Sequence, residues 1–128
     1  MASKRNIVNP QQFKLFKDEC YKYMEKLGLA DWNIHITCDG CVDQNHALAS
    51  VVFSPDGLNA NINLTKDWSD EPITKTAILR AALHEVCHIL TARMENLAID
   101  RFASEKEIFE ESERIARRVE HLVWGWKR

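Results

Sequence analysis

Two histidines and a glutamate occur together in the segment His84-Glu85-Val86-Cys87-His88. If this segment is helical, residues four apart share one face, so both imidazoles can hold the same metal ion. Glu85 then lies close enough to reach a water on that metal. Zinc suits such a pair because it binds imidazole nitrogen and leaves one position open at catalytic sites. The alternative is an exposed helix that carries two histidines and a glutamate by coincidence.

The helix that carries this motif is expected to be long and largely buried. It is expected to start near Pro72, which suits a first helical turn, with acceptors for the free N–H groups at residues 69–71. Its buried face is formed by Ile78, Leu79, Ala82, Leu83, Val86, Ile89 and Leu90. We expect the helix to end near Arg93, with the motif close to that end. A metal would satisfy the two histidines, since unpaired buried polar groups are costly.

A catalytic zinc site usually has three protein ligands, so one more residue is needed. The last helix is rich in candidates; the capping-box sequence at residues 104–107 marks its start, and Trp124 is near its expected end. Its expected core-facing arc consists of Ile108, Phe109, Ser112, Ile115, Ala116, Val119, Leu122, Val123 and Trp126. Glu111 and Glu113 flank this arc on opposite sides, and the periodicity does not choose between them.

The composition is that of one globular domain without a strongly charged surface. The chain has 128 residues, of which 45% are hydrophobic and 28% charged, and its net charge is -2. We therefore expect a single domain, 1–128, and no nucleic-acid partner. No apolar run is long enough to span a membrane, and the first residues lack the apolar segment of a signal peptide. These features predict a cytoplasmic protein whose four cysteines are thiols.

One helix and three strands are expected before the motif helix. The helix is predicted from about Pro10 to Leu27, and the strands at Trp32–Thr37, Ala47–Phe53 and Leu58–Leu64. The Pro-Asp-Gly turn at residues 55–57 is expected to join the last two strands as an antiparallel hairpin. This order predicts the α+β class, with a small, mainly antiparallel sheet packed against the motif helix and the C-terminal helix.

A second pair of candidate metal ligands lies in the segment Cys38-Asp-Gly-Cys41. Asp-Gly favours a tight turn, so we expect a turn that carries two thiols. With His35 and His46 nearby, a structural metal site is the alternative. The sequence has no second cysteine pair at the spacing that a strong zinc prediction requires.

The chain resembles the gluzincins, zinc metallopeptidases with H-E-x-x-H on one helix and a glutamate ligand on the next. It is most similar to their minimal forms, the minigluzincins, and to short H-E-x-x-H proteins encoded in phage and prophage genomes. Those proteins share an L-H-E-x-x-H-x-L motif, here Leu83–Leu90, and a late E-x-[VI]-[VA]-x-x-[LV]-E helix, here Glu113–Glu120. Leu29–Ile36 also resembles their first strand. The resemblance implies a zincin-like fold and Glu113 as the third ligand, with Glu111 as the second choice.

The same resemblance implies a zinc-dependent metallopeptidase acting on a peptide or protein. His84, His88 and Glu113 would hold Zn²⁺, and Glu85 would act as general base toward a metal-activated water. The strand Leu58–Leu64 is expected to be the sheet edge that aligns an extended peptide. If the chain is phage-encoded, the host cytoplasm is the expected location.

One role in this chemistry has no evident residue. Gluzincins generally supply a tyrosine or histidine that stabilises the oxyanion, but no tyrosine follows Tyr23, which leaves His121 and Arg93 as substitutes. Since losing such a donor costs about 10²–10³ in rate, we expect weak or highly selective activity. The alternatives are a catalytically inactive zinc domain that binds another protein, and a helical domain without metal. Residue types predict neither the substrate nor the oligomeric state.

Overall fold

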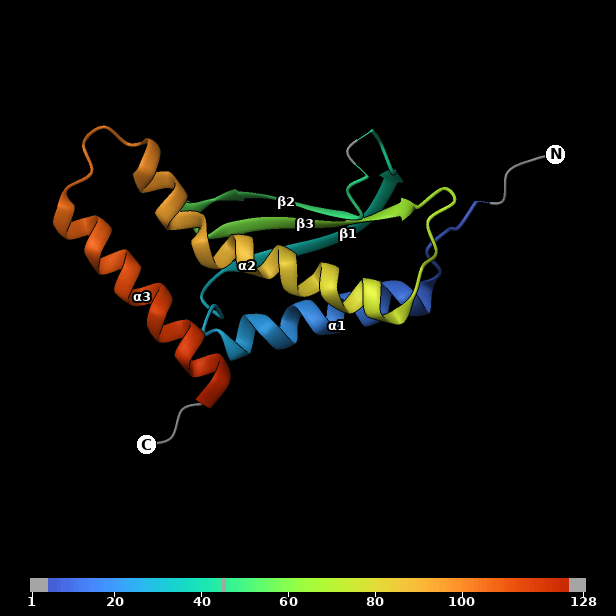
Figure 1. The fold of residues 1–128 in the computed structure, drawn as a ribbon, viewed down its shortest axis with the longest axis horizontal. Coiled ribbons are helices and arrows are strands. Elements are labelled where there is room, and N and C mark those ends of the chain that lie inside the picture. Colours follow the sequence, from blue (N-terminus) through green and yellow to red (C-terminus); the bar gives the residue numbers. More distant parts are fainter. Residues whose placement is uncertain (1–4, 45, 125–128) are drawn as a thin grey trace.

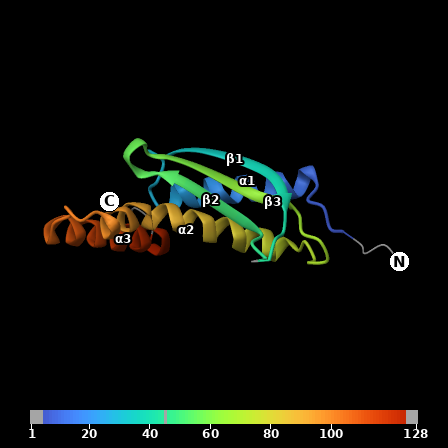
Figure 2. The same ribbon diagram turned by 90° about the horizontal axis from the view of Figure 1, so that it is seen from above.

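Three helices and a three-stranded sheet make up the computed structural model, which describes residues 5–44 and 46–124. The elements are α1 (Pro10–Lys26), β1 (Asn33–Cys41), β2 (Ala49–Ser54), β3 (Asn59–Asp67), α2 (Lys75–Ile99) and α3 (Glu105–Trp124), with a 3-10 turn at Pro55–Gly57. Helices α1 and α2 run side by side against one face of the sheet, and α3 lies beyond its end (Figures 1 and 2). The α+β class is therefore confirmed. Within the described ranges, no helix has the length and apolar content needed to cross a membrane.

The core lies between the sheet and the helices α1 and α2. Strand β3 shows the pattern most clearly, because Ala60, Ile62 and Leu64 are buried whereas Asn59 and Asn61 are exposed on the other face. The other core side chains include Phe16, Cys20 and Met24 of α1, Ile36 of β1, and Ile78, Ala82, Val86 and Ile89 of α2. Burial of these apolar side chains fixes the face of α2 that turns inward, and so fixes the direction of the motif residues.

The sheet is mixed, with the order β1-β3-β2. The predicted hairpin is confirmed, since β2 and β3 pair antiparallel, but β1 joins the other side of β3 in parallel. The expectation of a mainly antiparallel sheet is therefore only half right. The strand predicted at Leu58–Leu64 corresponds to β3, which is central and not an edge, so that prediction is wrong; β2 is an edge strand instead.

Strand β1 continues through the segment in which a turn was expected. Cys38 to Cys41 belong to the strand and stay in register with β3. Asn63 of β3 explains this, because its side chain accepts a hydrogen bond from the Asp39 N–H at 3.0 Å and donates to the Asp39 carbonyl at 3.1 Å. Gly40 provides the positive φ of 83° that this stretch requires. An unforeseen side-chain contact across the sheet thus replaces the turn.

The ends of the first two helices are set by side-chain caps. Asn9 and Gln12 form a reciprocal capping box at the start of α1. The start of α2 is capped by Thr74, whose hydroxyl accepts from the Ala77 N–H at 3.1 Å, and not by residues 69–71. Helix α2 also runs to Ile99, well beyond the expected end at Arg93. The motif therefore lies in the middle of a long helix, where the backbone is held on both sides.

Helix α3 starts as predicted but presents a different face to the domain. Ser104 and Glu107 form the expected capping box. The expected core-facing arc is largely exposed, with Phe109 at 64%, Val119 at 44% and Val123 at 70% of full exposure. The residues that turn toward the domain include Glu111 and Arg118 instead, because both find polar partners on α2 or after α1. The predicted packing of this arc is therefore wrong for most of its members, although Ile115 and Leu122 are partly buried against the core as expected. Trp126 lies outside the described residues.

Candidate metal centre

Helix α2 brings His84, Glu85 and His88 together at the edge of the core. His84 is exposed, His88 is half-buried, and Glu85 is buried with 4% exposure. The apolar neighbours of the motif, such as Val86 and Ile89, pack into the core on the opposite side of the helix. Their burial leaves the two imidazoles on the outer flank, where an ion can enter from solvent.

The two imidazoles converge on one point. Their Nε2 atoms lie 3.2 Å apart, and the rings are nearly perpendicular at 85°. Two nitrogens bound to one tetrahedral zinc at about 2.0–2.1 Å lie roughly 3.3 Å from each other, so the pair already has the separation that zinc requires. The same separation suits an N–H···N hydrogen bond between two neutral rings. The separation of the two nitrogens is therefore compatible with a shared zinc ion as well as with a direct hydrogen bond.

Glu85 completes a cluster that could hold a metal ion. One ligand atom from each of the three residues lies within 4.8 Å of the others, and this is the single such cluster among the described residues. The Oε2 atom of Glu85 is buried and accepts no hydrogen bond from the part of the chain that the structure describes. Burial raises the pKa of this carboxyl, while His84 and His88 act in the opposite direction. A buried carboxylate oxygen without a protein partner fits a site that takes up a metal and its water.

A cavity opens beside the cluster, between α2 and the start of β2. Its volume is about 450 Å³. His84, Glu85 and Arg80 line it together with small or apolar residues, namely Ala47, Leu48, Ala49, Ala77 and Ala81. Since β2 is an edge strand, an extended chain bound along it would pass next to the histidines. This cavity could not be predicted from residue patterns, because it is formed by segments about thirty residues apart in the chain.

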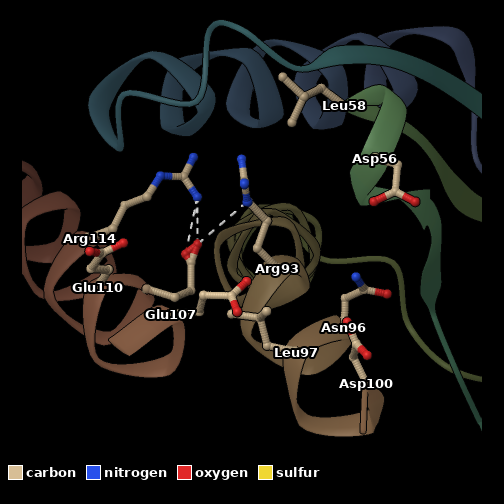
Figure 3. Close-up of a pocket in the computed structure, with 10 residues that line it drawn as sticks. Asp56, Leu58, Arg93, Asn96, Leu97, Asp100, Glu107, Glu110 and Arg114 are labelled. Carbon is tan, nitrogen blue, oxygen red and sulfur yellow. Dashed lines mark hydrogen bonds and ion pairs between the residues drawn. The ribbon is translucent and has the colours of Figure 1, made fainter. Parts of the chain in front are cut away.

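The two candidates for a third ligand do not join the cluster in this arrangement. Glu113 is exposed on α3. Glu111 is buried, and its carboxylate lies 2.8 Å from Arg114 and 3.8 Å from Arg93 of α2. This ion-pair group lines a second cavity of about 640 Å³ between the end of α2, the start of α3 and the turn before β3, into which Figure 3 looks. Helix α3 thus contacts α2 at residues that follow the motif. The role of Glu113 as third metal ligand stays a prediction, and it requires α3 to rotate or shift.

The other sequence candidates are also apart from the cluster. Cys38 and Cys41 lie on β1, and neither they nor His35 and His46 form a group of three metal-ligating side chains within the described ranges. Arg93, one proposed oxyanion donor, forms an ion pair with Glu111. The ion pairs of Arg93 and Arg114 with Glu111 were missed, although the Glu111–Arg114 spacing of three residues on one helix was a usable signal.

Comparison with known proteins adds no independent support: no protein-family model, curated protein or solved structure matches the chain.

Proposed function

We propose that the chain is a zinc-dependent metallopeptidase in which His84 and His88 bind the metal and Glu85 acts as general base. The observation that carries this proposal is the 3.2 Å separation of the two Nε2 atoms, with a buried carboxylate on the same turn of α2. Two neutral nitrogen ligands and a neighbouring acid are a donor set that zinc accepts readily. A helix that only packed in the core would gain nothing from an unpartnered carboxylate oxygen there.

Zinc, when bound, supplies a Lewis acid for a carbonyl oxygen and lowers the pKa of a coordinated water to about 7. Glu85 would take a proton from the attacking water and pass it to the leaving amide nitrogen. The edge of β2 aligns the backbone of an extended peptide, and the cavity beside His84 receives one of its side chains.

Glu113 is proposed as the third ligand, supplied by a movement of α3. The alternative is Glu111, which would first have to leave Arg93 and Arg114. Zinc titration of Glu113→Ala and Glu111→Ala separates the two. If Glu113 is the ligand, its variant loses more zinc affinity, whereas Glu111→Ala mainly lowers the stability of α3. The reverse order of affinities would exclude Glu113.

A zinc-containing module that binds another protein is the second candidate. It is favoured by the exposed position of Glu113 and by the ion pair of Arg93 with Glu111, which keep a candidate third ligand and one candidate oxyanion donor away from the cluster. Such a module would bind its partner equally well with or without Glu85.

The variant Glu85→Gln distinguishes the two candidates. It keeps the shape of the side chain and removes the base, so a peptidase should lose about 10²–10⁴ in rate on a peptide library while still binding zinc. His88→Ala is the matched control that should lose both zinc and cleavage. A wild-type chain that holds zinc but cleaves no peptide, and binds a partner unchanged by Glu85→Gln, would favour the binding module.

A further inference from the structure

The outward face of α3 is apolar along most of its length. Phe109, Ser112, Ala116, Val119 and Val123 are all exposed, and successive members are three or four residues apart. This spacing keeps them on one stripe of the helix, the arrangement by which two helices pack through a seam. The opposite flank of α3 is already used, since Glu111 and Arg118 contact the domain. The stripe is therefore a helix face that lacks a partner in the described part of the chain.

Small residues occupy the centre of the stripe and larger ones its ends. Ser112 and Ala116 would let a second backbone approach closely, while Phe109 and Val119 would fill the space beside them. If an identical helix lies antiparallel with its centre near residue 114, Phe109 meets Val119 of the copy and Ser112 meets Ala116 of the copy. The large residues Phe109 and Val119 then face each other in the outer layers, and the small pair Ser112–Ala116 forms the central layers, where the two backbones come closest. Val123 lies beyond these layers, next to Glu105 of the copy.

The charges of α3 favour this antiparallel orientation. Glu111, Arg114 and Arg118 already have partners within the domain, so the exposed charges beside the stripe decide the orientation. Lys106, Glu113 and Glu120 are seven residues apart and lie along one flank of the stripe. Beside the seam, Lys106 faces Glu120 of the copy at both ends. Glu113 meets its own copy across the axis, an adverse contact that the two Lys106–Glu120 pairs offset.

We infer that two copies of this chain associate through the stripe on α3 (Phe109, Ser112, Ala116, Val119 and Val123) in an antiparallel, two-fold arrangement. The seam from Phe109 to Val123 is roughly 20 Å long, since each helical residue rises 1.5 Å. A contact of this length is at the small end of specific interfaces, so the dimer is weak and its dissociation constant lies in the micromolar range. The association does not require a metal.

Sedimentation equilibrium of the metal-free chain, over concentrations from micromolar to millimolar, tests this dimer. The wild type should convert from monomer to dimer in that range. Phe109→Glu/Val119→Glu buries four charges in the seam and should raise the dissociation constant at least about 100-fold. Val52→Glu, which changes an equally exposed residue of β2, should leave it unchanged. A wild type that stays monomeric throughout, or a dimer lost with Val52→Glu and not with the α3 variant, overturns the inference.

A charge exchange tests the antiparallel orientation. It also tests the dimer itself if the variant Phe109→Glu/Val119→Glu fails to fold. Lys106→Glu and Glu120→Lys should each raise the dissociation constant about 3- to 10-fold, because each creates two like-charged pairs. The double variant restores both pairs and should return to within about twofold of the wild type. Additive weakening in the double variant would exclude the antiparallel arrangement.

Discussion

Glu85 is buried, although His84 of the same motif is exposed and His88 is half-buried. Ligand atoms of the three residues lie within 4.8 Å of one another on α2, as their spacing predicted. The depth of Glu85 could not be predicted, because it depends on α1, whose Cys20 packs nearby and is itself fully buried. Burial of a carboxylate is a tertiary effect, set by elements distant in the sequence.

The Cys20 thiol should make the stability of the fold depend on pH in the alkaline range. Burial, with smaller contributions from Glu85 and Glu19, raises its pKa from 9.0 to about 12. Above pH 9 the unfolded thiol loses its proton and the folded thiol keeps it, so stability falls as pH rises from about 9 to 12. Below pH 8 the effect vanishes.

Urea unfolding of the wild type and of Cys20→Ala, at pH 7 and at pH 10, measures this dependence. Groups other than Cys20 titrate alike in both proteins. The stability that Cys20 contributes should therefore be smaller by about 1.4 kcal/mol at pH 10 than at pH 7. If the wild type and Cys20→Ala differ in unfolding free energy by the same amount at pH 7 and at pH 10, water reaches the thiol in the folded protein.

Among the elements, helix starts were predicted best where the cap is local. Ser104 and Glu107 form the expected capping box, and the start of α1, expected near Pro10, is fixed by a second box of the same spacing between Asn9 and Gln12. The start of α2 was misplaced because Pro72 offered an attractive first turn, while Thr74 makes the actual cap. The far end of α2 was placed too early, since the sequence has no sharp stop signal before Asp100.

Removal of the α2 cap should destabilise the helix that carries the metal ligands. Thr74→Ala deletes the acceptor for the Ala77 N–H and should lower the free energy of unfolding by about 1 kcal/mol. Thr76→Ala is the matched control, because Thr76 is exposed in the same turn, and it should change stability by less than about 0.5 kcal/mol. Equal losses from the two variants would show that the cap is not formed in solution.

At the scale of the whole molecule, the arrangement of α3 and the strand order were beyond the sequence. Periodicity correctly identified an apolar arc on α3, but it could not tell which part of the arc faces the domain. Ile115 and Leu122 pack against the core, and two polar contacts also orient the helix: Glu111 with Arg93, and Arg118 with the end of α1. Likewise, alternation found three strands, yet it could not show that β3 is central, because a partner on each side leaves the pattern of inward residues unchanged.

Arg118 should hold the far end of α3 against the rest of the domain. Its guanidinium donates to the carbonyls of Leu27, at 3.0 Å, and Gly28, where the negative end of the α1 dipole favours a cation. Arg118→Ala should cost about 1–2 kcal/mol and speed amide hydrogen exchange in α3 more than in α2. The exposed neighbour Arg117 supplies the control Arg117→Ala, which should alter neither quantity. Unchanged exchange in Arg118→Ala would show that α3 is held by other contacts.

The central claim is that two imidazoles on adjacent turns of α2 share one zinc ion. X-ray absorption at the zinc edge, on protein purified without added metal, tests it most directly. We predict about one zinc per chain, with scattering from two imidazole nitrogens at about 2.0–2.1 Å, and complete loss of that signal in His84→Ala/His88→Ala. A metal-free wild type that also fails to take up added zinc, or a zinc signal that survives in the double variant, would contradict the claim.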